Sequence, residues 1–178
     1  RSSAASDVYK RQYVGSAVSG LLDGKLVSGR GLYTADHQVA DMGHMAVVRS
    51  PYAHAVIMKV STAAALDLPG VRIVATGTDI VKWTKPIPHT LDPASFGGKT
   101  AKIYCLAVDR VRYVGEPVVA VVADSRNIAF EAAGLVEIEY EELQVITDAE
   151  AALKPDSALL YPDWKTNELM RVRFAGGD

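Results

Sequence analysis

The first stretch whose residue types suggest chemistry is Gly98-Lys99-Thr100, which matches the end of the pattern for a phosphate-binding loop. In such a loop, backbone N–H groups cradle the phosphates, while the lysine and the hydroxyl reach the phosphates and a magnesium ion. The pattern needs a glycine five positions before Gly98 and a strand ahead of it. Pro93 occupies that position, and the preceding residues are rich in proline. We therefore expect a flexible loop tip, and a nucleotide-binding function is the least favoured of three interpretations.

A second candidate is a group of four glutamates, Glu137, Glu139, Glu141 and Glu142. Two carboxylates held close together have pKa values that are driven apart, which suits general acid and base catalysis. Side chains alternate between the two faces of a strand, so Glu137 and Glu139 are expected on the face opposite the apolar residues. We interpret the group as the solvated edge of a strand.

The histidines and the cysteine form the third candidate set. His37, His44, His54 and His89 are far apart in the sequence, and none pairs with another at the spacing of metal ligands on a helix. His54 stands between two expected strands without a nucleophile beside it, which favours packing or capping over catalysis. Cys105 lies in a strand-like run, where a free cysteine is usually a small buried hydrophobe.

Gly29-Arg30-Gly31 is a weak match to a dinucleotide-binding fingerprint. It lacks the third glycine and the preceding strand, so we interpret it as a turn. A single cysteine also excludes an internal disulfide and any zinc or iron–sulfur site built from cysteines of this chain alone. These residue types predict no catalytic, cofactor-binding or metal-binding residue within the 178 residues.

The elements that would position these residues are organised around residues 111–140. Gly115 and Pro117 mark a turn, and the apolar, β-branched run 118–123 predicts a strand buried on both faces. Asp124 or Ser125 can cap a following helix, which ends near Gly134, and period-two alternation over 136–140 predicts another strand. Strand, helix and strand within about thirty residues have the size of a βαβ unit, which predicts parallel strands joined by a right-handed crossover.

A second strand, helix and strand unit precedes the first. Strands are expected at 45–49, 55–60 and 71–75, with a short helix between the last two that begins at Ser61 or Thr62. Residues 82–102 form a proline- and glycine-rich loop of about twenty residues, a length usually associated with function or disorder. Further expected elements are a strand at 103–108, a short helix at 148–153 and a strand at 169–174.

Composition limits the class of protein and its partners. The chain is 49% hydrophobic with a net charge of −2, which favours a folded globular domain and gives no reason to expect nucleic acid or a membrane as a partner. No apolar run approaches the roughly 20 residues of a membrane span. We therefore expect a soluble protein in a reducing, cytoplasmic compartment.

Five segments, taken in order, resemble the xanthine dehydrogenase and aldehyde oxidase family. The resemblance is to the N-terminal α/β-hammerhead domain of the molybdopterin-binding large subunit, as in bacterial carbon monoxide dehydrogenase-like enzymes, and it runs from about residue 13 to at least residue 152. The segments are residues 25–29 with 33–36, 48–55, 68–71, 111–125, and 133–140 with Leu143.

The resemblance implies an α+β fold, the α/β-hammerhead, as a mixed sheet with two strand-helix-strand units. Residues 1–12 lie outside the resemblance and are polar and small without an apolar period, so we expect a non-native or disordered leader there. The resemblance implies that residues 13–153 form the hammerhead domain and that residues 154–178 start a linker or strand into a molybdenum-cofactor-binding domain. Tyr52 stands where many relatives have a histidine, a departure expected to change packing more than chemistry.

For function, the resemblance implies a parent oxidoreductase that hydroxylates aldehydes, N-heteroaromatics or small substrates like carbon monoxide. Molybdopterin would carry the chemistry and bind outside this fragment, with iron–sulfur clusters and FAD in partner domains or subunits. The chain's own partners would be the later molybdenum-binding domains, the iron–sulfur and flavin subunits, and the small-molecule substrate.

This chain would then be a scaffold and substrate-funnel domain without its own active site. We expect residues 82–102, with Trp83 and Phe96, to lie near that funnel, because long loops with aromatic residues often line binding sites. The alternative is a stand-alone, non-catalytic binding or assembly module with the hammerhead fold.

Overall fold

The computed structural model describes residue 15 and residues 17–177. The chain divides into two compact units, one ending at Ala40 and one beginning at Asp41. Residues 1–12, the expected leader, lie outside the described residues. The two units are described separately below.

The first unit contains two short helical turns, α2 (Asp23–Val27) and the 3₁₀ helix η1 (Thr34–Asp36). The Gly20 N–H donates to Asp23 Oδ2 (2.6 Å) at the start of α2, and the Arg30 N–H donates to the Lys25 carbonyl (2.8 Å) at its end. Gly29 has a φ of 67°, a conformation that glycine adopts without steric cost, so the predicted turn is confirmed. Helix α2 was not among the elements expected from the sequence.

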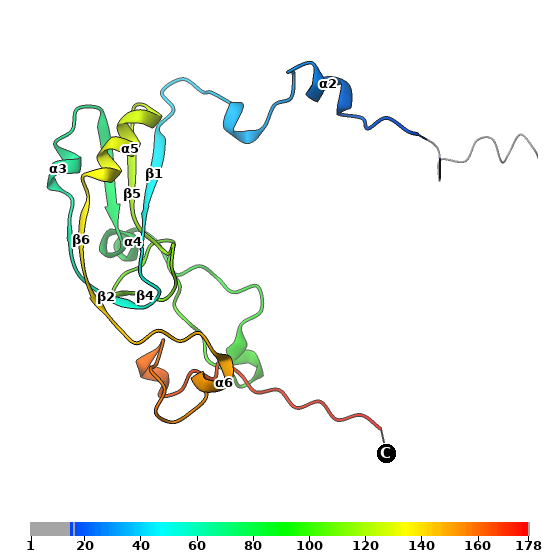
Figure 1. Ribbon diagram of the computed structural model, residues 1–178, viewed down its shortest axis with the longest axis vertical. Helices are drawn as coiled ribbons and strands as arrows, with labels where there is room; N and C mark the ends of the chain where they lie inside the picture. Colours follow the sequence, from blue (N-terminus) through cyan, green and yellow to red (C-terminus); the bar gives the residue numbers. More distant parts are fainter. Residues whose placement is uncertain (1–14, 16, 178) are drawn as a thin grey trace, which may run out of the picture. The chain divides into compact units, whose positions relative to one another are not determined.

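The second unit contains two antiparallel sheets among its described residues (Figure 1). Sheet A has the order β1 (His44–Arg49), β5 (Pro117–Ala123), β3 (Val71–Thr76). Sheet B has the order β4 (Arg110–Val111), β2 (Ala55–Ser61), β6 (Glu137–Glu142). The helices are α3 (Ala63–Leu66), α4 (Gly77–Trp83), α5 (Arg126–Gly134) and α6 (Ala149–Ala152), with the 3₁₀ helices η2 (Pro93–Phe96) and η3 (Pro162–Trp164).

Strand β5 lies at the centre of the core. Val118, Val119, Val121 and Ala123 are at most 1% exposed, as the unbroken apolar run predicts. Helix α5 covers the strand with Ala129 and Ala132, both fully buried. The Ser125 hydroxyl caps α5 by accepting a hydrogen bond from the Ile128 N–H (3.3 Å), so the predicted capped helix is confirmed.

The order strand, helix, strand is confirmed for both units, but the predicted parallel pairing is wrong. Strands β5 and β6, which flank α5, belong to different sheets, and so do β2 and β3, which flank α3. All ladders between described strands are antiparallel, so the second unit is an α+β fold with two antiparallel sheets where a mixed sheet was expected. The local sequence pattern predicts where a strand or helix forms. It does not predict which strands pair in a sheet, because the pairing depends on segments that are far apart in the sequence.

Helix α4 is an element that the sequence interpretation missed. Thr76 and Asp79 begin it: the Thr76 N–H and hydroxyl both donate to Asp79 Oδ2, at 3.0 and 2.6 Å. These two hydrogen bonds lower the pKa of the Asp79 carboxyl. A threonine followed three residues later by an acidic residue is the sequence signal that could have found this helix.

Two expected strands are absent from the described structure. Residues 103–108 are irregular, and the Ala107 N–H is bonded to the Pro117 carbonyl (2.7 Å) at the entrance to β5. Residues 169–174 also have no strand partner, although the Leu169 carbonyl accepts a hydrogen bond from the Lys99 N–H (2.9 Å). Both segments carry a strand-like apolar pattern, but neither forms a ladder with a described strand.

Alanine substitutions at two separate glycines, Gly77 and Gly134, test how tightly α4 packs on residues 107–108. A Cβ at Gly77 would lie 2.0 Å from the Ala107 carbonyl oxygen and 2.7 Å from Val108 Cα, both backbone atoms. We expect Gly77→Ala to lower the free energy of unfolding by about 3 kcal/mol, at the upper end for an overpacked site. Gly134→Ala is the control, because its Cβ would meet nothing within 4 Å, and it should be neutral or stabilising by up to about 1 kcal/mol. Urea unfolding of both variants measures the difference, and equal effects would contradict the packing described here.

Candidate functional site

A cleft of about 700 Å³ lies in the second unit, within the size range of small-molecule sites. Three segments line it: the irregular stretch before β4, the turn between β4 and β5, and the 3₁₀ helix η3. The lining residues are Ile87, residues 100–110, Arg112, Tyr113, Glu116, Pro117, Tyr161, Pro162, Asp163 and Trp164.

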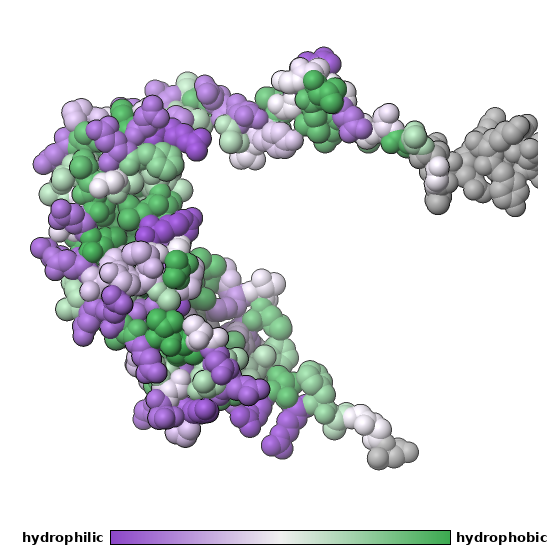
Figure 2. Space-filling model, viewed as in Figure 1, coloured by the Kyte–Doolittle hydropathy of each residue, from purple (hydrophilic) through white to green (hydrophobic). Residues whose placement is uncertain are grey.

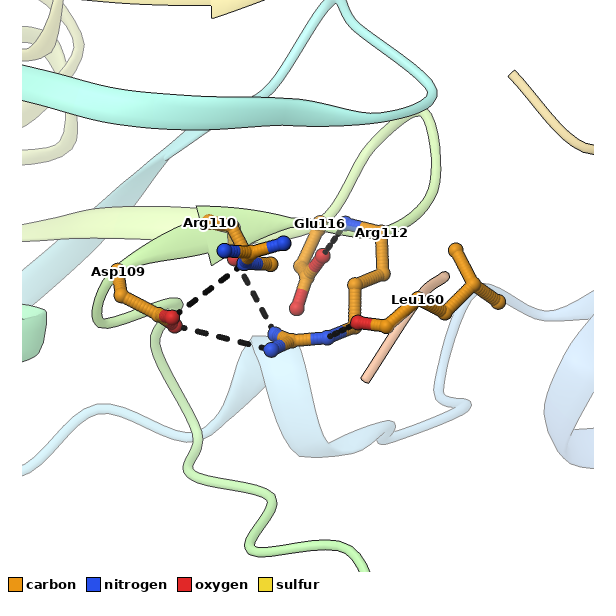
Figure 3. A network of polar contacts seen from close by, with 5 residues as sticks. All are labelled: Asp109, Arg110, Arg112, Glu116 and Leu160. Carbon is orange, nitrogen blue, oxygen red and sulfur yellow. Dashed lines mark hydrogen bonds and ion pairs between the residues drawn. The ribbon is translucent and has the colours of Figure 1, made fainter. Parts of the chain in front are cut away.

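The Arg112 side chain connects two walls of this cleft (Figure 3). Its Nε donates to the Leu160 carbonyl (3.1 Å), and its Nη1 donates to the Arg110 carbonyl (3.3 Å). Its Nη2 lies 3.7 Å from Asp109 Oδ1. The guanidinium also lies over the Tyr161 ring, 4.6 Å from its centroid, and that ring stacks on Trp164 at 4.3 Å. A planar guanidinium used for both hydrogen bonds and stacking is a role that lysine does not reproduce.

Glu116 is the half-buried carboxyl of the cleft. Burial raises its pKa, and two effects of Arg112 oppose this: a hydrogen bond from the Arg112 N–H to the carboxylate, and the charge of the guanidinium. A raised pKa occurs at acid/base sites and also in structural networks. Here the carboxylate accepts from the backbone of the turn that it closes, so we assign Glu116 a structural role in shaping the cleft.

The turn between β4 and β5 is clasped by the loop between β1 and β2. Arg49 Nη1 donates to the Gly115 carbonyl (2.9 Å), the Ser50 N–H donates to the Glu116 carbonyl (2.9 Å), and the Gly115 N–H donates to the Ser50 carbonyl (2.8 Å). Gly115 has a φ of 88°, which favours glycine at this position. Two of the five segments that carry the family resemblance therefore contact each other directly.

His54, in the same loop, is 3% exposed. Its Nδ1 lies 2.9 Å from the Gln144 carbonyl oxygen, which can only accept, so Nδ1 carries a proton and donates it. Nε2 is buried without a hydrogen-bond partner among the described residues, as is the hydroxyl of Tyr140. Burial raises the pKa of Tyr140, whose ring packs 5.0 Å from that of Tyr52. The packing role predicted for His54 is confirmed.

Gly98-Lys99-Thr100 is not arranged to bind phosphate. The N–H groups of Gly97, Gly98 and Lys99 already donate to the carbonyls of Ala94, Pro93 and Leu169. Lys99 Nζ donates to the Glu168 carbonyl (3.2 Å), and the Thr100 hydroxyl is bonded to Asp92. The segment lies in a loop, as predicted, but it is fixed to residues 168–169 and is not the free tip that the sequence suggested.

The other candidate residues do not come together as a site. Glu137, Glu139, Glu141 and Glu142 are exposed on β6, where Lys59 Nζ lies 3.4 Å from Glu139 Oε1, so the solvated strand edge is confirmed. His89 Nε2 lies 2.9 Å from the Ala101 carbonyl oxygen. Within the described part of the chain, no three His, Cys, Asp or Glu residues are placed to hold a metal ion.

Cys105 contradicts its prediction. It is exposed and lines the cleft, whereas Leu106 and Ala107 are 4% and 7% exposed. The strand-like run that suggested a buried cysteine is not a strand, because residues 103–108 form no ladder. Arg112 and Glu116 were not among the candidate residues chosen from the sequence. The only signal for them was the presence of charged residues in a turn that leads into an apolar strand.

The pKa shifts of two carboxyls predict opposite effects of pH. Because the folded pKa of Glu116 is raised, the folded state binds its proton more tightly than the unfolded state, and stability falls as pH rises past the unfolded value of 4.5. Glu116→Gln should therefore become more stable relative to the wild type between pH 4 and pH 7. The folded pKa of Asp79 is lowered, so its charged carboxylate stabilises the folded wild type as pH rises toward the unfolded value of 3.8. Asp79→Asn should therefore become less stable relative to the wild type as pH rises through 3.8. Urea unfolding at several pH values measures both, and the same sign for the two variants would contradict the assignment.

Comparison with known proteins gives the chain a family. Residues 28–144 match the family described as aldehyde oxidase and xanthine dehydrogenase, a/b hammerhead domain. The large subunit of nicotine 6-hydroxylase from Paenarthrobacter nicotinovorans is 40% identical over 144 residues, which are 81% of this chain and 17% of that subunit.

Solved structures agree with this match. Quinoline 2-oxidoreductase from Pseudomonas putida 86 aligns with a TM-score of 0.71 and 42% identity, over 80% of this chain and 18% of that one. The Cu,Mo-CO dehydrogenase aligns with a TM-score of 0.71 and 33% identity, over 84% of this chain and 18% of that one. The chain thus spans less than a fifth of the length of these relatives.

The described helices were also compared with the requirements of a membrane span. None of them is long and apolar enough to cross a bilayer.

The match over residues 28–144 and the shared hammerhead fold lead to one conclusion: the chain belongs to the aldehyde oxidase and xanthine dehydrogenase family, of which it carries the α/β-hammerhead domain.

Proposed function

We propose that this chain is the hammerhead domain of the large subunit of a molybdenum hydroxylase. The observation that carries the proposal is the match of its whole hammerhead region to hydroxylase and dehydrogenase large subunits. The substrate class would be aldehydes, N-heteroaromatics or small molecules like carbon monoxide. The stand-alone binding module is not favoured, since the matched relatives carry this domain within an enzyme subunit.

The molybdenum cofactor is part of this proposal, as the electron acceptor for hydroxylation of the substrate. The described residues do not fit a metal site, because they bring no three His, Cys, Asp or Glu side chains together. The polar groups of the cleft are also engaged: Arg112 with two carbonyls and Glu116 with the backbone of its turn. We therefore expect the cofactor to bind in later domains of the parent polypeptide, and iron–sulfur clusters and FAD to be held by partner domains or subunits.

The role proposed for this chain is a scaffold that shapes the approach to the cofactor. Residues 84–103 fold back on themselves through the Ile87 N–H to Ile103 carbonyl bond (2.7 Å) and the contact of His89 with Ala101. The loop nevertheless leaves large apolar side chains exposed, among them Leu91 (67%) and Phe96 (53%). Apolar surface of this kind marks an interaction or binding surface, which supports a funnel wall. Trp83 ends α4 at the start of this loop and is also exposed.

The domain limits follow from the same proposal. The hammerhead would extend over residues 13–153, and residues 154–178 would lead toward the cofactor-binding domain. Residues 160–169 are bonded to the hammerhead through Arg112 and Lys99, which supports an ordered connection at this point. A cytoplasmic location is also proposed, supported by a cysteine content that excludes an internal disulfide.

A direct test of the alternative is the coding sequence beyond Asp178. The proposal predicts that the reading frame continues for several hundred residues and includes a glycine-rich cofactor loop and a late glutamate. A stop codon directly after Asp178 in the native gene would favour the stand-alone module.

Two phenylalanines of similar exposure test the funnel. Phe96 in the loop is 53% exposed and Phe130 on α5 is 57% exposed, so truncating either side chain to alanine removes a similar amount of exposed apolar surface. In the complete enzyme, we expect Phe96→Ala to change the kcat/KM ratio between a bulky heteroaromatic and a small aldehyde by about fivefold, since lost apolar contacts contribute about 1 kcal/mol. Phe130→Ala should leave the ratio unchanged. Equal ratios in both variants and the wild type would reject Phe96 as part of the funnel.

A further inference from the structure

We propose that Arg112 is a positioning residue that holds loop residues 92–100 in place through the segment 158–169. The first contact is the one at the cleft, where the guanidinium binds the Leu160 carbonyl and covers the Tyr161 ring. The Arg112 side chain is 22% exposed, so these charge-assisted hydrogen bonds are partly shielded from water. They connect β4 of sheet B to a segment that has no strand partner among the described residues.

The second step is the side chain of Asn167, which ties this segment together. Its Oδ1 accepts from the Leu160 N–H (3.0 Å), and its Nδ2 donates to the carbonyls of Ala158 (2.7 Å) and Ala152 (3.0 Å). Both backbone groups of Leu160 are therefore hydrogen-bonded: its carbonyl accepts from Arg112, and its N–H donates to Asn167. Releasing Arg112 should loosen the loop that Asn167 closes.

The third step passes to the loop itself. The Lys99 N–H donates to the Leu169 carbonyl (2.9 Å), and Lys99 Nζ donates to the Glu168 carbonyl (3.2 Å), both directly after Asn167. Gly98 is in close contact here, because a Cβ at this position would lie 3.0 Å from the Leu169 carbonyl oxygen. Within the loop, Asp92 accepts from the Ala94 N–H (3.1 Å) and from Thr100. The loop tip is thus fixed to the segment that Arg112 holds.

The consequence is that Arg112, which lines the cleft, sets the place of loop residues 92–100 through a segment more than forty residues further along the chain. Coupling of this kind requires a measured effect and not only a continuous set of contacts. The structural part of the inference stands independently of the catalytic proposal. Its effect on substrate rests on the proposed function, in which the same loop lines the funnel.

The test is hydrogen exchange in the complete protein that carries this chain, with Arg112→Lys as the variant. Lysine keeps the positive charge but lacks the planar guanidinium that donates to two carbonyls at once. Amide hydrogen exchange at residues 92–100 and 158–169 should therefore become at least about tenfold faster, while β5 and α5 stay protected. The Lys99 amide is the most direct reporter. Arg110→Lys is the matched control, since its side chain pairs with Asp109 and its backbone carbonyl still accepts from Arg112. It should leave both segments protected.

Asn167→Ala provides a second variant that lies outside the sheets, in case Arg112→Lys disturbs the fold. It should expose the same two segments. Unchanged protection of residues 92–100 in either variant would overturn the proposal, even if residues 158–169 become exposed. In a double-mutant cycle, Arg112→Lys and Lys99→Met should be clearly non-additive at residues 92–100, and additive effects would also overturn it. If the loop loosens while substrate preference is unchanged, Arg112 keeps its positioning role and the funnel proposal fails.

Discussion

The structure depends first on the burial of strand β5 between two antiparallel partners and one covering helix. Val118, Val119 and Val121 are almost fully buried, and β1 and β3 satisfy the backbone of the strand on both edges. A strand of this kind cannot face water on either side, so its neighbours must cover it. Helix α5 does so from the adjoining sequence, and the clasp of Ser50 on Gly115 and Glu116 fixes the turn that enters the strand.

The cleft is held differently from this core. Its walls are irregular segments joined by side chain to backbone hydrogen bonds, chiefly those of Arg112, Asn167 and Lys99. Segments with few apolar contacts belong to the less stable part of a protein, where local opening is easier. Figure 2 shows green, apolar residues on the visible surface. Ile87 and Phe96 are among the large apolar side chains that are at least half exposed. Such surface suits a domain that works inside a larger subunit.

Strand β5 and helix α5 were predictable from sequence, whereas the pairing of the strands was not. The run 118–123, the cap at Ser125 and the stop near Gly134 identify β5 and α5 because strong local preferences agree there. The partners of β5 lie more than forty residues away, so the βαβ size alone suggested a parallel pair that does not form. Cys105 was misplaced for a related reason: residues 103–108 have an apolar, strand-like composition, but they form no ladder that would fix which side chains are buried. Arg112 was missed because its contact with the distant Leu160 carbonyl leaves no local signature, and Glu116 because its carboxylate accepts from the backbone of its own turn without a recognised motif.

The central claim is that this hammerhead domain belongs to a molybdenum hydroxylase. The most direct measurement is the metal content of the complete native protein that carries residues 1–178, purified with its subunits and analysed for molybdenum. The account predicts about one molybdenum per copy of this chain, as expected if the cofactor carries the chemistry. A fully folded native protein that is isolated repeatedly without molybdenum, and that oxidises none of the proposed substrates after cofactor is supplied, would contradict it.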